Sequence, residues 1–248
     1  MAPENTLESF AAGLSAGADR LELDVHASAD GQVVVFHDDT LDRTTDGTGP
    51  VKGRTLAELK RLDAGSQFRA PDGSSPFRDR GIRIPTLDEL LVACPDVPLN
   101  IEIKQDDPAI ESAVLAVLDR HRARGRTLLA AEEGSIMLRI RAAAPDVVTS
   151  FSAPEVADFI FRLRDGRLDA DYRPPGVALQ VPPSCEGTPI VTPESLAAAH
   201  ALGLEVHVWT INDPDEMGAL LDLGVDALMT DFPAVGATVL QRRGLRPG

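Results

Sequence analysis

The sequence of 248 residues is long enough for one large domain or two small ones, and its hydrophobic fraction of 43% allows a sizeable core. The formal net charge of −15 argues against nucleic acid or an anionic membrane as a partner. An anionic substrate would therefore need local positive charge at its site, from a metal ion or from a placed Lys or Arg.

Cysteine usage and hydropathy limit the class of protein further. Cys94 and Cys185 are the only cysteines, and their wide separation favours free core thiols over a disulfide or a zinc site. No apolar run approaches the ~20 residues of a membrane-spanning helix, and no signal peptide is recognisable. We therefore expect no stable membrane insertion and a cytoplasmic location.

Apolar β-type runs alternate with helical runs along the chain, which predicts a parallel sheet. The helix at 192–203, for example, begins with Thr192 as its cap and Pro193 in its first turn. The predicted strands span 21–25, 99–103, 127–131, 147–151, 177–181, 205–210 and 227–231. The predicted helices span 4–17, 84–94, 108–123, 135–144, 154–165, 192–203, 213–224 and 234–243.

The strands are short and mixed on their two faces, unlike the nearly continuous apolar strands of a doubly wound sheet. Their polar and aromatic residues collect toward the C-terminal ends, where a (β/α)8 barrel builds its active site. These residues are Glu22, Asp24, Glu102, Lys104, Ser150, Gln180, Trp209 and Asp231. We predict one TIM-type (β/α)8 barrel domain over residues 1–248. With about seven strands and a helix first, it lacks its first strand.

One irregular insertion interrupts the pattern at about 40–85. It follows a hairpin strand at 32–39 and contains a short helix at 55–65 and a polar stretch at 66–81 that we interpret as a surface loop. A long insertion in a barrel is often a lid or a binding loop. A simple excursion of the chain is the open alternative.

Two acidic residues alternate on the first predicted strand. Glu22, Asp24 and His26 share one face of it, because successive residues of a strand point to opposite sides. Two acids on one face of a buried strand repel each other unless a cation lies between them. A solvent-facing edge strand would also explain them, but a barrel interior favours a metal site.

The strand at 99–103 repeats this arrangement with Glu102 and Lys104 on one face. Lysine occurs only three times, and arginine supplies the other cations. Glu102 is a candidate third metal ligand beside Lys104 as a phosphate-pairing cation. An internal salt bridge is the alternative, and it could coexist with function because buried charges need partners.

Two further residues are candidates for the site. His37 follows an apolar strand and is a candidate general acid or base. Trp209 is the only tryptophan, and it could either wall a pocket or fill the barrel core.

These residues, in this order, resemble the glycerophosphodiester phosphodiesterase family. The matching stretches are PENTL at 3–7, GADRLELDVHASADGQVVVFHDDTLDRTTDGTG at 17–49, IPTLDELL at 84–91, LNIEIK at 99–104, HVWTIN at 207–212 and GVDALMTDFP at 224–233. The resemblance implies a TIM-type barrel that binds Mg²⁺ or Ca²⁺ and hydrolyses small glycerophosphodiesters to glycerol 3-phosphate and an alcohol. It implies that Glu22, Asp24 and Glu102 bind the metal, His37 is an acid/base residue, Lys104 pairs with the phosphate and Trp209 lines the pocket near the glycerol.

The sequence departs from the family pattern at two places. The family opens with a strand ending in His-Arg-Gly, which supplies a second acid/base histidine and a phosphate-binding arginine, and Met1 and Ala2 stand in that place. Phe232 stands where the family usually has Arg. We therefore expect impaired hydrolysis. The alternatives are a non-catalytic relative that binds a metal or a phosphodiester, and a phospholipase D-like phosphodiesterase of the same superfamily.

Overall fold

The computed structural model describes residues 1–168 and 171–246. The α-helices within these residues are α1 (Leu7–Ser15), α2 (Leu56–Leu59), α3 (Leu87–Ala93), α4 (Glu111–Arg120), α5 (Gly134–Ala143), α6 (Ala153–Arg164), α7 (Pro193–Ala201), α8 (Pro214–Leu223) and α9 (Pro233–Arg242). The strands are β1 (Leu21–Ala27), β2 (Val33–Val35), β3 (Leu99–Ile103), β4 (Thr127–Ala130), β5 (Val148–Thr149), β6 (Ala178–Val181), β7 (Ser184–Cys185), β8 (Thr188–Pro189), β9 (Glu205–Val208) and β10 (Ala227–Leu228). Two short 3-10 helices are η1 (Val51–Gly53) and η2 (Arg124–Arg126).

Within residues 1–168 and 171–246, seven parallel strands follow one another in chain order. A five-stranded sheet has the order β2-β1-β3-β4-β5, with β2 antiparallel, and a three-stranded sheet has the order β10-β9-β6. A parallel bridge between Ser150 and Ala178 joins the two sheets at the β5–β6 seam, where Phe151 N also donates to Ala178 O at 2.9 Å. No strand pairing joins β10 to β1 in the described part of the chain. The predicted TIM-type barrel is therefore confirmed, and within the described residues no pairing of strands closes it.

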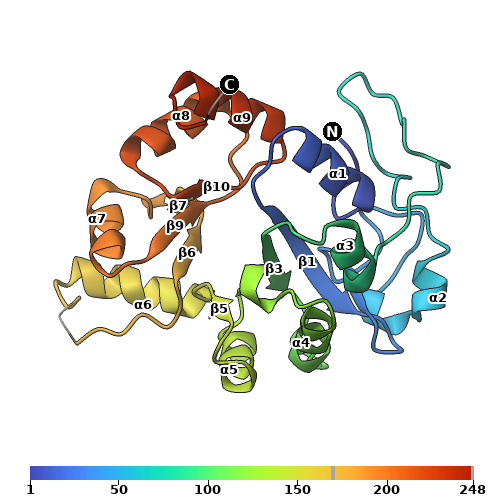
Figure 1. Cartoon of the computed structure of the whole chain (residues 1–248), viewed down its shortest axis with the longest axis horizontal. Helices are drawn as coiled ribbons and strands as arrows, with labels where there is room; N and C mark the ends of the chain where they lie inside the picture. The colour runs from blue at the N-terminus through green and yellow to red at the C-terminus, as the bar shows by residue number, and fades with distance from the viewer. Residues whose placement is uncertain (169–170, 247–248) are drawn as a thin grey trace.

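The helices lie outside the strands (Figure 1). Leu21, Leu23 and Val25 of β1 pack in an apolar cluster with α3, α4 and α5, so the alternate residues of β1 face the interior. A second cluster joins the outer faces of β6 and β9 to α6, α7 and α8. Arg246 follows α9, donates to the carbonyl of Gly17 and lies 3.3 Å from Asp19, so the C-terminal end contacts the turn after α1.

Local signals set the helix and strand ends. The α7 helix begins as predicted, because the Thr192 hydroxyl accepts from Ser195 N at 3.1 Å and Pro193 occupies the first turn. The strand predicted at 227–231 ends at Leu228. Beyond it, the Thr230 hydroxyl and the Asp231 backbone N–H donate instead to the side-chain oxygen of Asn212, each at 3.0 Å.

The segment 40–85 has a small core of its own, formed with β2 by the buried residues Val34, Phe36, Leu41, Val51, Leu59, Ala64, Ile82 and Ile84. The polar stretch 66–81 contains no helix or strand, as predicted. The helix predicted at 55–65 is only the single turn α2, because Asp63 turns the chain by accepting from Gly65 N at 2.9 Å.

The two cysteines lie in different surroundings. Cys94 is buried, but Cys185 is exposed on the β7–β8 hairpin, so the expected core location is wrong for Cys185 while both thiols are free. Across residues 1–168 and 171–246, no helix has both the length and the apolar character required to cross a membrane.

Candidate active site

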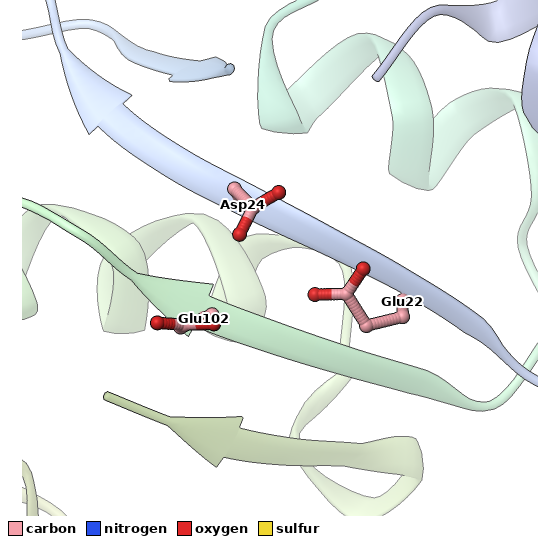
Figure 2. Close-up of side chains that lie close together, drawn as sticks. All are labelled: Glu22, Asp24 and Glu102. Atoms are coloured by element: carbon pink, nitrogen blue, oxygen red, sulfur yellow. The ribbon is translucent and has the colours of Figure 1, made fainter. Parts of the chain in front are cut away.

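The metal ligands predicted from the sequence lie together on two neighbouring strands. The parallel register of β1 and β3 sets Asp24 opposite Glu102, and Glu22 lies one inward position earlier on β1. One carboxylate oxygen from each of Glu22, Asp24 and Glu102 lies within 4.8 Å of the other two (Figure 2). The strand alternation that sends Leu21, Leu23 and Val25 outward thus gathers three acids inside the barrel.

Lys104 is the cation of this cluster. Its Nζ lies 2.8 Å from Glu102 Oε1 and 3.3 Å from Asp24 Oδ1. Burial lowers the pKa of Lys104, but the two carboxylates outweigh burial and raise it overall, so the side chain is charged. The predicted salt bridge therefore exists alongside the carboxylate cluster.

Glu22 differs from the other two acids because its carboxylate makes no hydrogen bond or ion pair within the described residues. Desolvation raises its pKa well above the ordinary value, and Asp24 and Glu102 raise it further by repulsion. Part of the side chain is exposed, so its desolvation by the surrounding barrel is incomplete and the carboxylate repulsion carries more weight.

The cluster fits a divalent cation. The three carboxylates and Lys104, which pairs with two of them, leave a net charge of two negative units in a partly buried site when all the groups are ionised. Carboxylate oxygens are the ligands that Mg²⁺ and Ca²⁺ prefer. Buried charges of one sign need a partner of the other, so the donor set and its charge both suit such an ion.

Asn5 is a site residue that the sequence reasoning missed. Its Nδ2 donates to Asp24 Oδ2 at 2.9 Å, and its Oδ1 accepts from Asp24 N at 3.3 Å. Asn5 has a φ of 52°, a left-handed conformation that asparagine adopts more readily than most residues. The signal was present in the Pro-Glu-Asn-Thr turn, but only the fold places that turn against β1.

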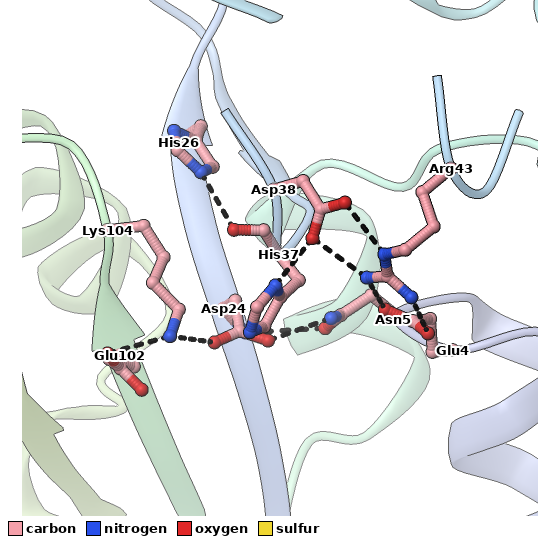
Figure 3. A network of polar contacts seen from close by, with 9 residues as sticks. All are labelled: Glu4, Asn5, Asp24, His26, His37, Asp38, Arg43, Glu102 and Lys104. Atoms are coloured by element: carbon pink, nitrogen blue, oxygen red, sulfur yellow. Dashed lines mark hydrogen bonds and ion pairs between the residues drawn. The ribbon is translucent and has the colours of Figure 1, made fainter. Parts of the chain in front are cut away.

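His37 reaches the same end of the barrel through the β2 hairpin. Phe36 N donates to Asp24 O at 2.9 Å, so the residue after Phe36 emerges beside the carboxylates. The His37 ring bonds through Nδ1 to Asp38 Oδ1 at 2.7 Å, and its side chain is 49% exposed (Figure 3). Burial raises the pKa of the nearby Glu102 above its ordinary value, although Lys104 lowers it.

His26 was predicted to share the face of Glu22 and Asp24, and it is buried there. Burial lowers its pKa, which favours the neutral imidazole. Its Nε2 lies 3.1 Å from the carbonyl oxygen of His37, and that nitrogen carries the proton it donates. His26 therefore holds the backbone of His37.

Trp209 directly follows β9 and is 43% exposed. This exposure excludes the alternative in which it fills the core. Asp231 follows β10 and is near enough to raise the pKa of Glu22 by repulsion. Both residues therefore lie at the C-terminal side of the strands, where the carboxylates also lie.

Comparisons with known proteins identify the family of the chain. The family model described as "Glycerophosphoryl diester phosphodiesterase family" matches residues 1–235. A glycerophosphodiester phosphodiesterase of Caldanaerobacter subterraneus is 30% identical, with 98% of this chain and 94% of the relative covered. One of Bacillus subtilis is also 30% identical, with 93% and 80% covered.

Solved structures show the same fold. An Oleispira antarctica phosphodiesterase in complex with the product sn-glycerol-3-phosphate aligns with a TM-score of 0.80 at 28% identity, covering 97% of this chain and 92% of the other. A glycerophosphodiester phosphodiesterase of Agrobacterium tumefaciens aligns with a TM-score of 0.76 at 27% identity, covering 96% and 94%. The predicted fold and the prediction of an enzyme are thus confirmed. The chain belongs to the glycerophosphoryl diester phosphodiesterase family.

Proposed function

We propose that this protein hydrolyses glycerophosphodiesters to glycerol 3-phosphate and an alcohol, and that the reaction requires Mg²⁺ or Ca²⁺. The observation that supports this most directly is the cluster of Glu22, Asp24 and Glu102 around Lys104. A phosphodiester is an anion, and a protein with a net charge of −15 needs a local cation to bind it. The related Oleispira enzyme, with its bound sn-glycerol-3-phosphate, supports the same product.

The roles follow from the positions of the residues. Glu22, Asp24 and Glu102 would hold the cation, which when bound supplies charge neutralisation at the phosphate. Lys104, no longer the sole counter-ion of the carboxylates, would pair with a phosphoryl oxygen as charge develops there. His37 would transfer a proton at Nε2, and Trp209 would line the pocket on the glycerol side.

We further propose that this chain hydrolyses its substrate more slowly than is typical of the family. Among the described histidines beside the cluster, His37 is exposed and has Nε2 unbonded, whereas His26 is buried and bonded through Nε2 to a carbonyl. A single group then serves both the nucleophile and the leaving alcohol. A missing general acid or base lowers the rate by about 10²–10⁴-fold.

Neither alternative function is proposed. A phospholipase D-like enzyme predicts an apolar, lipid-facing loop, and the segment 66–81 is polar. A non-catalytic binding role remains an outcome of the test below. We also propose that residues 1–248 form one catalytic domain, which the continuous run of strands supports.

The test combines a binding and an activity measurement. Calorimetry with Mg²⁺ or Ca²⁺ should show binding that Glu22→Gln and Glu102→Gln abolish, while Glu8→Gln on the exposed face of α1 leaves it unchanged. Release of glycerol 3-phosphate from glycerophosphocholine should require the cation. Binding that persists in both variants refutes the ligand assignment. Binding without any product release in the unaltered chain refutes the hydrolytic function.

A further inference from the structure

The His37 side chain is half exposed, yet one of its ring nitrogens is firmly held. Nδ1 bonds to Asp38 Oδ1 at 2.7 Å, whereas Nε2 makes no hydrogen bond within residues 1–168 and 171–246. An exposed imidazole with no partner would sample several rotamers and both neutral tautomers. What fixes Asp38 therefore also fixes His37.

Asp38 is fixed by Arg43 through two parallel bonds. Arg43 Nε donates to Asp38 Oδ2 at 2.7 Å, and Nη2 donates to Oδ1 at 2.8 Å (Figure 3). This two-point geometry suits a planar guanidinium and cannot be reproduced by an ammonium group. Hydrogen bonding from Arg43 holds the pKa of Asp38 at about 2, so Asp38 is a charged acceptor at neutral pH.

Arg43 is in turn fixed by Glu4. Nη1 donates to Glu4 Oε2 at 2.7 Å, and Nη2 donates to Oε1 at 2.6 Å. The guanidinium is thus held between two carboxylates, one on each side. Glu4 precedes Asn5, which bonds to Asp24, so one short turn is tied both to the metal cluster and to the acid/base residue.

The backbone of His37 is held separately. The buried His26 bonds to the His37 carbonyl at 3.1 Å, and Phe36 N bonds to Asp24 O at 2.9 Å. The backbone position of His37 therefore does not depend on Arg43. The contacts from Glu4 through Arg43 to Asp38 can therefore determine only the orientation and the tautomer of the His37 ring.

We propose that Arg43, supported by Glu4, is a positioning residue that holds Asp38 against His37 Nδ1 and so keeps the proton on Nδ1 and the lone pair on Nε2. An ionised carboxylate only accepts hydrogen bonds, so Nδ1 must be the donor and Nε2 the basic nitrogen. Nε2 then takes a proton from the nucleophile, and the resulting imidazolium can return it from the same atom to the leaving alcohol. This role rests on the proposed function, in which His37 is the acid/base residue.

The first measurement does not need activity. The imidazole ¹⁵N shifts of His37 report which nitrogen carries the proton, at about pH 8.5, two units above an ordinary histidine pKa. The unaltered chain should show the proton on Nδ1. Asp38→Ala and Arg43→Met should shift the population toward Nε2, the tautomer that free histidine prefers in water, and Arg43→Lys should fall between. His37→Ala assigns the signal.

Arg243→Met is the matched control. Arg243 makes the same two-point contact, with Nε donating to Asp222 Oδ1 at 3.0 Å and Nη2 donating to Oδ2 at 3.1 Å, but between α9 and α8. It should leave the His37 shifts and turnover unchanged. Metal binding by calorimetry should stay intact in Arg43→Met, because Asn5 and not Arg43 contacts Asp24.

The second measurement is kinetic. Loss of a residue that orients a functional side chain typically lowers activity about 10–100-fold. Arg43→Met should show this loss in kcat with little change in KM. Arg43→Lys should recover part of it. His37 shifts that do not change in Arg43→Met overturn the proposal, whatever the activity. Altered shifts in a chain that never releases glycerol 3-phosphate would support the positioning and reject the proposed function, so the two failures are distinguishable.

Discussion

The amide of Asn5 holds Asp24 at two points, donating to the carboxylate at 2.9 Å and accepting from the backbone N–H at 3.3 Å. The second contact gives the backbone N–H of Asp24 a hydrogen-bond partner on the side of β1 that faces away from β3. Asn5 thus fixes both the strand and the side chain of a proposed metal ligand.

Asn5→Ala should therefore weaken divalent cation binding. Removal of a group that orients a ligand lowers metal affinity by about 10–100-fold, and calorimetry with Ca²⁺ or Mg²⁺ would measure it. Ser9→Ala is the control, because Ser9 caps the same helix α1 without contacting Asp24. Equal affinities in the two variants would show that Asn5 has no such role.

Lys104→Met should change metal binding and turnover in opposite directions. Loss of a like charge beside the cation should raise its affinity by about tenfold or more, since Lys104 lies 2.8 Å from Glu102. Turnover should fall, because the Lys104 ammonium no longer pairs with the phosphoryl oxygen as charge develops there. Lys60→Met, which removes a comparable ion pair with Glu89, should change neither. A loss of metal affinity in Lys104→Met would contradict the assignment.

The metal-free protein should lose stability as the pH rises. The pKa of Glu22 is raised in the folded state above its ordinary value of 4.5, so the folded chain binds this proton more tightly than the unfolded chain. The free energy of unfolding should fall from about pH 4.5 upward, through the folded pKa, and then level off. Urea unfolding at several pH values would measure the fall, which should shrink in Glu22→Gln and with saturating Ca²⁺. An unchanged pH profile in Glu22→Gln would refute the repulsion.

Gly176→Ala should destabilise the seam between β5 and β6. A Cβ at this position would lie 2.5 Å from Thr149 O and 2.7 Å from Ser150 O, both backbone atoms that cannot move aside cheaply. Overpacking of this kind costs about 1–3 kcal/mol, measurable by urea unfolding. Gly125→Ala is the control, because nothing lies within 4 Å of its Cβ. Equal stability of the two variants would contradict the prediction.

Periodicity was sufficient to predict the strands and helices that form the barrel. Alternation also predicted that Glu22, Asp24 and Glu102 share the interior, because register between neighbouring parallel strands leaves little freedom. The contacts of Asn5 and Arg43 could not be predicted in the same way. They join a turn near residue 4 to residues 24 and 43, and no local pattern states which distant loops will meet.

Two further differences have the same origin. The β7–β8 hairpin was missed because its strands, Ser184–Cys185 and Thr188–Pro189, are too short to show alternation. The sequence could not decide whether Trp209 walls a pocket or fills the core, because its exposure depends on where the chain turns after β9. The sequence sets each element, and the packing of loops decides the surroundings of its last residues.

The β5–β6 seam also has a consequence for local opening. One bridge, between Ser150 and Ala178, joins the two sheets, whereas the β1–β3 pairing runs over five residue pairs. The two apolar clusters lie on opposite sides of this seam. Amide hydrogens of Phe151 and Val177, which bond across it at 2.9 and 2.8 Å, should therefore exchange with solvent sooner than those of β3. The barrel would then open in halves that each keep a core, and the carboxylate cluster of Glu22, Asp24 and Glu102 would stay whole in the half that contains β1 and β3.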